Sequence, residues 1–161
     1  MILRRVTVEN YRCFRSPVTV GEFGDGLNMV FGPNETGKST LVEAVVRTLF
    51  DRHKTSGALL KQVQPWGTSG LVPRVLVEFE ARGEHYQLEK RFVVEPMAEL
   101  RVRRNGAWIP ARSGDEANDY VSELLHGERS ERGPSTARAV GDSPCAVGSL
   151  QPGPGIRYAK R

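Results

Sequence analysis

The sequence has 161 residues, of which 39% are hydrophobic and 26% charged, a balance that fits one globular domain and excludes a fibrous or wholly disordered chain. The formal net charge of +4 would suit contact with a polyanion such as DNA but is too small to identify one. The sequence has neither a long apolar run nor the continuous apolar core of a signal peptide near its start, so we expect a cytoplasmic protein without membrane contact.

The first part of the chain predicts strands followed by a helix. Residues 2–8 alternate apolar with polar side chains, and residues 18–23 form a short β-branched run, so both are predicted to be strands. Residues 27–31 are a continuous apolar run, typical of a strand buried inside an α/β sheet. Apolar residues then recur with helical spacing over residues 38–50, which predicts a helix packed against that sheet.

The following part predicts a small antiparallel sheet. Strand-like runs at residues 72–80, 85–94 and 99–104 are separated by short turn sequences, which indicates a β meander over residues 72–104. Residues 115–125 have the pattern of a helix, which would complete a lobe spanning residues 1–126. Residues 127–161 are rich in glycine and proline and lack an apolar period, so we expect a disordered tail.

A glycine-rich loop between the strand at 27–31 and the helix at 38–50 carries the chemistry. Residues 32–39 read Gly-Pro-Asn-Glu-Thr-Gly-Lys-Ser and fit the phosphate-binding pattern G-x-x-x-x-G-K-[ST]. Gly32 and Gly37 permit a tight loop whose backbone N–H groups turn toward phosphates. Lys38 would place its ammonium group on the β- and γ-phosphates, and the Ser39 hydroxyl would coordinate Mg²⁺. The predicted ligands are therefore ATP and Mg²⁺.

Two segments make the sequence similar to a known family. Residues 3–14 end in the element Asn-Tyr-Arg-Cys-Phe, and residues 27–41 surround the loop. Together they resemble the N-terminal lobe of the SMC/RecF/SbcC-type ATPases, which are ABC-like ATPases of DNA repair and chromosome maintenance. The resemblance implies an α/β fold of the P-loop NTPase type, the N-terminal half of an ABC-type ATPase head with an antiparallel β subdomain. The glutamate that follows Pro-Asn in the loop favours the SbcC-like branch.

The resemblance also implies further site residues and partners. Arg12 would lie near the bound phosphates, although a solvated arginine at a strand end would explain the same residue. Asn34 would line the nucleotide site, although its loop position would equally suit a turn. Glu35, Thr36 and Thr40 complete the expected nucleotide-binding set. The implied partners are DNA and either a complementary ATPase lobe or a nuclease subunit.

The sequence also departs from the family. It contains no signature motif of Leu-Ser-Gly-Gly type, no Walker B strand ending in Asp-Glu, and no glutamine loop in the expected context. We therefore assign no catalytic residue and expect the chain to be unable to hydrolyse ATP alone. We expect either a truncated N-terminal lobe or a chain whose native sequence ends near Val140.

Two alternatives to this ATPase lobe stay open. One is a small P-loop kinase, although the strands ahead of the loop and the meander behind it disfavour that class. The other is a non-enzymatic remnant that binds nucleotide weakly or not at all.

Overall fold

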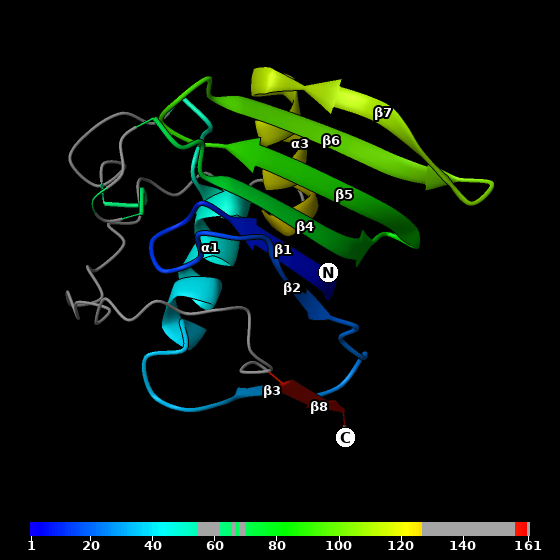
Figure 1. The fold of residues 1–161 in the computed structure, drawn as a ribbon. Coiled ribbons are helices and arrows are strands. Elements are labelled where there is room, and N and C mark those ends of the chain that lie inside the picture. The colour runs from blue at the N-terminus through cyan, green and yellow to red at the C-terminus, as the bar shows by residue number, and fades with distance from the viewer. Residues whose placement is uncertain (55–61, 66, 68–69, 127–156, 161) are drawn as a thin grey trace.

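The computed structural model describes residues 1–54, 62–65, 67, 70–126 and 157–160, within which six strands form one antiparallel sheet. The order across the sheet is β2-β1-β4-β5-β6-β7 (Figure 1). The strands are β1 (Ile2–Glu9), β2 (Val18–Gly21), β4 (Arg74–Ala81), β5 (Glu84–Arg91), β6 (Met97–Arg104) and β7 (Ala107–Ser113). The antiparallel meander that the sequence predicts is thus present, and it continues onto β1 and β2.

Alternating burial explains why these segments form strands. In β4, every second residue is buried, among them Val75, Val77 and Phe79, while the intervening side chains are only half-buried. Successive side chains of a strand point to opposite faces, so this sequence gives one apolar and one polar face. The apolar face is the core of the protein.

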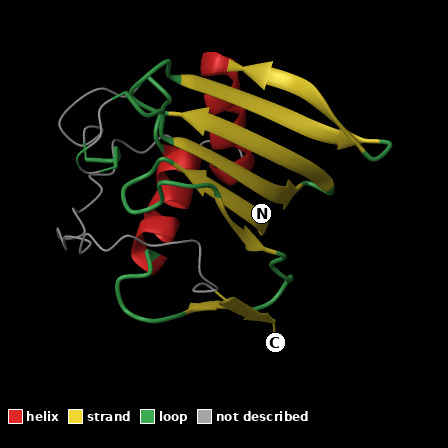
Figure 2. Ribbon diagram, viewed as in Figure 1, coloured by secondary structure: helices red, strands yellow, loops and turns green. Residues whose placement is uncertain are grey.

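Helices α1 (Lys38–Phe50) and α3 (Gly114–His126) cover that apolar face (Figures 1 and 2). Helix α1 buries Leu41, Ala44 and Leu49, and α3 buries Val121 and Leu124. The helix predicted over residues 38–50 is therefore observed with those bounds. No helix within the described part of the chain is long and apolar enough to cross a membrane.

Strand β3 (Asn28–Phe31) lies outside the large sheet. It pairs antiparallel with β8 (Arg157–Lys160) in a separate two-stranded sheet. The prediction that residues 27–31 form a buried strand was wrong about burial, since Met29 is 57% exposed and Phe31 is 45% exposed. The reason is that, among the described residues, β3 has no neighbouring strand besides β8 and no layer that covers these two side chains.

Two other segments differ from the sequence predictions. The meander does not end at residue 104, because the turn at Asn105 and Gly106 leads into β7, whose Pro110 occupies an outer edge strand where a missing N–H is tolerated. The tail expected to be disordered, residues 127–161, falls mostly outside the described residues. Within it, Arg157–Lys160 form a strand instead, and pairing with β3 rather than an apolar period explains that strand.

Candidate functional site

The glycine-rich loop connects β3 directly to α1, as a phosphate-binding loop requires. Gly37 has a left-handed backbone with φ 89°, which favours glycine, and it is the N-cap residue of α1. The helix has no side-chain cap hydrogen bond at this end and no acidic residue in its first turn. Its first N–H groups and its partial positive charge are therefore available to an anion.

The Asn-Tyr-Arg-Cys-Phe element packs against this loop. A Cβ atom added to Gly37 would lie 2.6 Å from Cζ of Phe14 and 2.9 Å from Sγ of Cys13, so only glycine fits here. The turn of this element is closed by hydrogen bonds between the backbones of Tyr11 and Phe14, 2.9 Å each. The structure thus brings together the two segments on which the family resemblance rests, and the contacting residues Phe14 and Gly37 are 23 positions apart in the sequence.

The side chains of the loop take distinct positions. The Lys38 ammonium donates to the carbonyl oxygens of Gly32 at 2.9 Å and Pro33 at 2.5 Å, and it therefore stays over the loop. The Thr36 hydroxyl donates to the Pro33 carbonyl at 2.9 Å, which closes the loop from within. Ser39 is exposed at the start of α1.

The remaining predicted loop residues divide into an exposed pair and a buried one. Asn34 and Glu35 are exposed, and Glu35 has a positive φ of 66° at the tip of the loop. Thr40 is 5% exposed, so its buried side chain supports the loop from the side of the core. Of these three residues only Glu35 is charged, so together they do not form a charged cluster.

Arg12 approaches α1 one helical turn beyond Ser39. Its guanidinium pairs with the Glu43 carboxylate at 2.6 Å, and its backbone N–H donates to the Val63 carbonyl at 2.7 Å. The Glu43 carboxylate also accepts from Arg47 at 2.8 Å. Sequence reasoning missed Glu43, although its spacing of four from Arg47 could have indicated a charged row along the helix.

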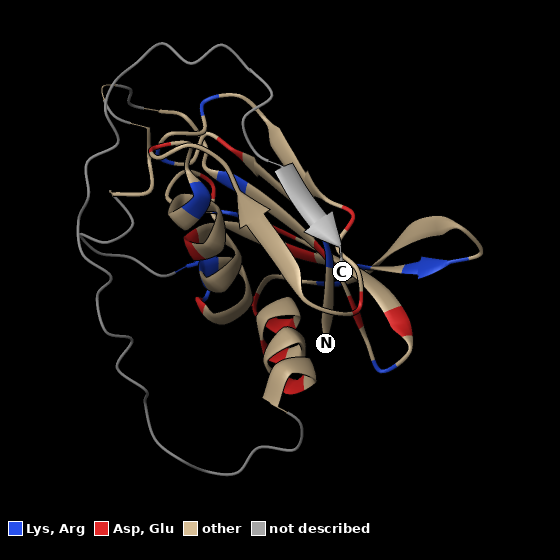
Figure 3. Cartoon of the chain, turned by 90° about the horizontal axis from the view of Figure 1, so that it is seen from below, with Lys and Arg blue, Asp and Glu red and all other residues tan. Residues whose placement is uncertain are grey.

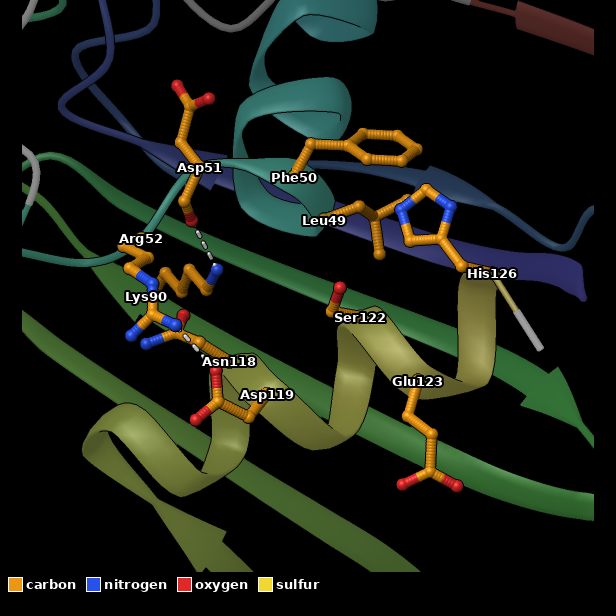
Figure 4. Close-up of a pocket in the computed structure, with 10 residues that line it drawn as sticks. All are labelled: Leu49, Phe50, Asp51, Arg52, Lys90, Asn118, Asp119, Ser122, Glu123 and His126. Atoms are coloured by element: carbon orange, nitrogen blue, oxygen red, sulfur yellow. Dashed lines mark hydrogen bonds and ion pairs between the residues drawn. The ribbon is translucent and has the colours of Figure 1, made fainter. Parts of the chain in front are cut away.

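A concavity with a volume of about 530 Å³ lies between the C-terminal end of α1 and α3, away from the loop (Figure 4). Lys90 of β5 is 1% exposed there, and its ammonium donates to the backbone carbonyl of Asp51 at 2.6 Å. Burial lowers the pKa of Lys90 to about 8. Lys90 thus caps the C-terminal end of the helix that begins at the glycine-rich loop.

Comparison with known proteins gives consistent matches. A family model described as an AAA domain matches residues 5–124. A DNA double-strand break repair Rad50 ATPase from Pyrococcus abyssi is 29% identical over 129 residues, which cover 78% of this chain and 14% of that protein. An uncharacterized protein of Mycobacterium tuberculosis is 32% identical over 158 residues, which cover 90% of this chain and 17% of that protein.

A solved structure from work on ATP-driven dimerization and DNA-stimulated activation of SMC ATPases has the same fold. The TM-score is 0.54 at 16% identity, and the match covers 78% of this chain and 80% of that chain. The curated relatives are much longer than the matched region, since this chain spans 14% and 17% of the two described above.

Proposed function

The chain belongs to the AAA domain family as the N-terminal, P-loop-bearing lobe of an SMC/Rad50-type ATPase, and on this premise we propose that residues 32–40 bind Mg²⁺-ATP. One observation carries the proposal. Gly37 has a left-handed backbone and lies between β3 and the start of α1, against Cys13 and Phe14. This end of α1 has no side-chain cap hydrogen bond and no acidic residue in its first turn. An anion at this position would meet inward N–H groups and the positive end of α1.

The residues of the loop suit the parts of a nucleotide triphosphate. The Lys38 side chain is long enough for its ammonium to leave the Gly32 and Pro33 carbonyl oxygens and to bind phosphate oxygens instead. The negative charge of a phosphate would compensate the ammonium better than neutral carbonyl oxygens do. The exposed Ser39 hydroxyl is the ligand for Mg²⁺, which prefers oxygen donors and shares its coordination with phosphates. When bound, the metal neutralises charge that develops on the transferred phosphoryl group.

We propose that this lobe alone turns over ATP very slowly. The sequence has no Walker B carboxylates to position a water molecule and no signature motif to complete the cage around the γ-phosphate. Phosphoryl transfer depends almost wholly on positioning and electrostatic stabilisation, so half of a site gives little catalysis.

The experiment is an ATP titration by calorimetry in the presence of Mg²⁺, run beside a steady-state phosphate-release assay. The wild-type protein should bind ATP, and Lys38→Ala should weaken binding at least tenfold because a charge-assisted contact to phosphate is lost. Lys54→Ala, which removes an exposed lysine paired with Asp115 far from the loop, is the matched control and should bind as the wild type does. Rapid hydrolysis that Lys38→Ala abolishes would contradict the proposal of slow turnover, and absence of binding would favour the non-enzymatic remnant.

We further propose that a complementary ATPase lobe covers β3 and the exposed face of α1. These elements and the residue before β3 carry large apolar side chains that are 45–73% exposed, namely Leu27, Met29, Phe31, Val42, Val46 and Phe50. Val42 and Val46 lie on the side of β3 that Val30 faces, and Met29 and Phe31 lie on its other side, so a lobe that covers them all has to wrap around β3. Exposed apolar side chains in this number are typical of an interface rather than of a free surface. The Rad50 relatives are far longer than the matched region, so they have room for such a lobe.

Replacement of Met29 and Val46 by serine tests this surface. Because the two side chains are 57% and 48% exposed, the double variant should fold as the wild type does. It should also self-associate less in sedimentation experiments, since an apolar surface that lacks its complementary lobe can pair with a second copy of the chain. The matched control is Ile109→Ser, which removes a side chain of similar exposure, 46%, from β7 on the opposite edge of the molecule. Equal behaviour of the two variants would contradict a specific interface on β3 and α1.

Contact with DNA is proposed only as weak and non-specific. Helix α3 carries the acidic side chains Asp115, Glu116, Asp119 and Glu123 (Figure 3), and three of them pair with Lys54, Arg52 and Arg82, so this helix offers no excess of basic charge to a polyanion. On the sheet, Arg74 pairs with Glu89 at 2.8 Å and Arg101 with Glu99 at 2.6 Å, so much of the basic charge is compensated internally. Affinity for a DNA duplex should fall with added salt and should not depend on the DNA sequence.

A further inference from the structure

Four charged side chains form a row that starts beside the phosphate-binding loop. Arg12 pairs with Glu43 at 2.6 Å, Glu43 with Arg47 at 2.8 Å, and Arg47 with Asp51 at 3.0 Å. Glu43 follows Ser39 by four residues, which places it on the same side of α1, and Asp51 follows the helix as its C-cap residue. Glu43 is therefore about one turn, roughly 6 Å along the helix axis, from the proposed metal ligand.

The backbone of Arg12 is held in place, and its side chain pairs with Glu43. Its φ of 49° and the 2.7 Å hydrogen bond from its N–H to Val63 hold the main chain, and its neighbours Cys13 and Phe14 lie against Gly37. Arginine has a long side chain, and Glu43 lies one turn from the loop, so we expect a change of rotamer to bring the Arg12 guanidinium from Glu43 to the mouth of the loop.

The ion pair with Glu43 does not satisfy the whole guanidinium. Nε of Arg12 is buried without a hydrogen-bond partner among the described residues, and a buried unpaired donor is costly. Glu43 also divides its charge between Arg12 and Arg47. A phosphate, which carries more charge than a carboxylate and offers more acceptors, would be the better partner for Arg12.

We propose that Glu43 competes with the nucleotide phosphates for the Arg12 guanidinium and in this way sets the affinity of the site for Mg²⁺-ATP. Glu43 is a positioning residue, because it acts on the nucleotide only through Arg12. The inference rests on the proposed function of residues 32–40 and assigns to α1 a carboxylate that weakens nucleotide binding. Removal of its charge should therefore strengthen binding.

The test is a double-mutant cycle measured as the Kd of Mg²⁺-ATP in four full-length proteins: wild type, Glu43→Gln, Arg12→Ala and the double variant. Glu43→Gln keeps the size of the side chain and should tighten binding about two- to fivefold, the range expected when a partly exposed ion pair no longer has to be broken. In the Arg12→Ala background the same change should have no effect. Asp51→Asn, which removes the other partner of Arg47 without touching Arg12, is the matched control and should bind as the wild type does.

The outcomes separate this inference from the proposed function. Weaker binding by Glu43→Gln, or an equal gain with and without Arg12, would overturn the competition while leaving the ATP site in place. A wild-type protein that does not bind Mg²⁺-ATP would overturn both. If Glu43→Gln does not fold, as judged by its thermal unfolding, Glu43→Asp shortens the carboxylate away from Arg12 and should also tighten binding, by a smaller factor.

Discussion

The antiparallel sheet and the region of β3 and α1 differ in how far they bury their apolar side chains. In the antiparallel sheet, Val75, Val77 and Leu100 are fully buried beneath α1 and α3. On the side of β3 and the outer face of α1, Met29 and Val42 are each 57% exposed although their residue types are typical of a core. The sheet thus buries its apolar side chains among the described residues, while the region that carries the glycine-rich loop presents apolar side chains outward.

With the proposed function, this difference separates the part of the molecule that stabilises the fold from the part that would bind nucleotide. The sheet supplies a packed support that holds the start of α1 and the Asn-Tyr-Arg-Cys-Phe element in place. One side of the loop between β3 and α1 packs against the Asn-Tyr-Arg-Cys-Phe element, and its other side is open. The proposed second lobe would cover the open side. Substitutions in the two regions should therefore differ in their effects on stability and on nucleotide binding.

Two phenylalanines should give the largest contrast between the regions. Phe79 is 1% exposed and stacks on Tyr86 with ring centroids 5.5 Å apart, so Phe79→Ala should lower the free energy of unfolding by about 3–5 kcal/mol. Phe50 is 57% exposed at the end of α1, and Phe50→Ala should cost less than about 1 kcal/mol. Urea unfolding measures both values, and similar losses would show that the outer face of α1 is as tightly packed as the core.

Two glycines with positive φ should come next. Gly37 has φ 89° and no room for a Cβ atom beside Phe14, so Gly37→Ala combines backbone strain with overpacking and should lower stability by roughly 2–3 kcal/mol. Gly106, in the β6–β7 turn, has φ 82° and nothing within 4 Å, so Gly106→Ala should cost only about 1 kcal/mol. Only Gly37→Ala should also abolish ATP binding, which a calorimetric titration of both variants would check.

The sequence predicts elements with a regular apolar period and misses features that depend on a distant partner. Helix α1 and strand β4 were predictable because every buried position follows one period. Strand β7 was missed because Pro110 interrupts its pattern, and β8 because its strand depends on pairing with β3. The loop at residues 32–39 was visible as a motif, since its chemistry depends on residues adjacent in sequence.

The supports of the site were harder to predict. The ion pair between Arg12 and Glu43 joins residues 31 positions apart, and no local pattern links them. Lys90 was missed because lysine is seldom buried, although it shares a strand face with Leu88 and Tyr86, and that spacing of two was a usable signal. Local spacing indicates which face a side chain occupies, while the fold decides what it meets there.

The junction between the regions should show a pH dependence. Lys90 has a pKa of about 8 in the folded protein and 10.5 as an ordinary lysine, so the unfolded chain holds this proton to higher pH. The contribution of Lys90 to stability is therefore complete above pH 10.5 and is lost as the pH falls through 8. Relative to Lys90→Met, the wild type should gain roughly 1–1.5 kcal/mol between pH 7 and pH 9. Parallel stability curves for the two proteins would contradict a buried, depressed lysine.

The smallest effect should come from an exposed ion pair that joins the β4–β5 turn to α3. Nη1 of Arg82 lies 3.1 Å from Oε1 of Glu123, and the two side chains are 51% and 55% exposed. Water and salt therefore screen their attraction. Glu123→Gln keeps the shape of the side chain and should lower the free energy of unfolding by less than about 1 kcal/mol at low salt. In 1 M salt the variant and the wild type should become indistinguishable. A larger loss that persists in salt would mean that the sheet region depends on its surface charges as well as on its buried core.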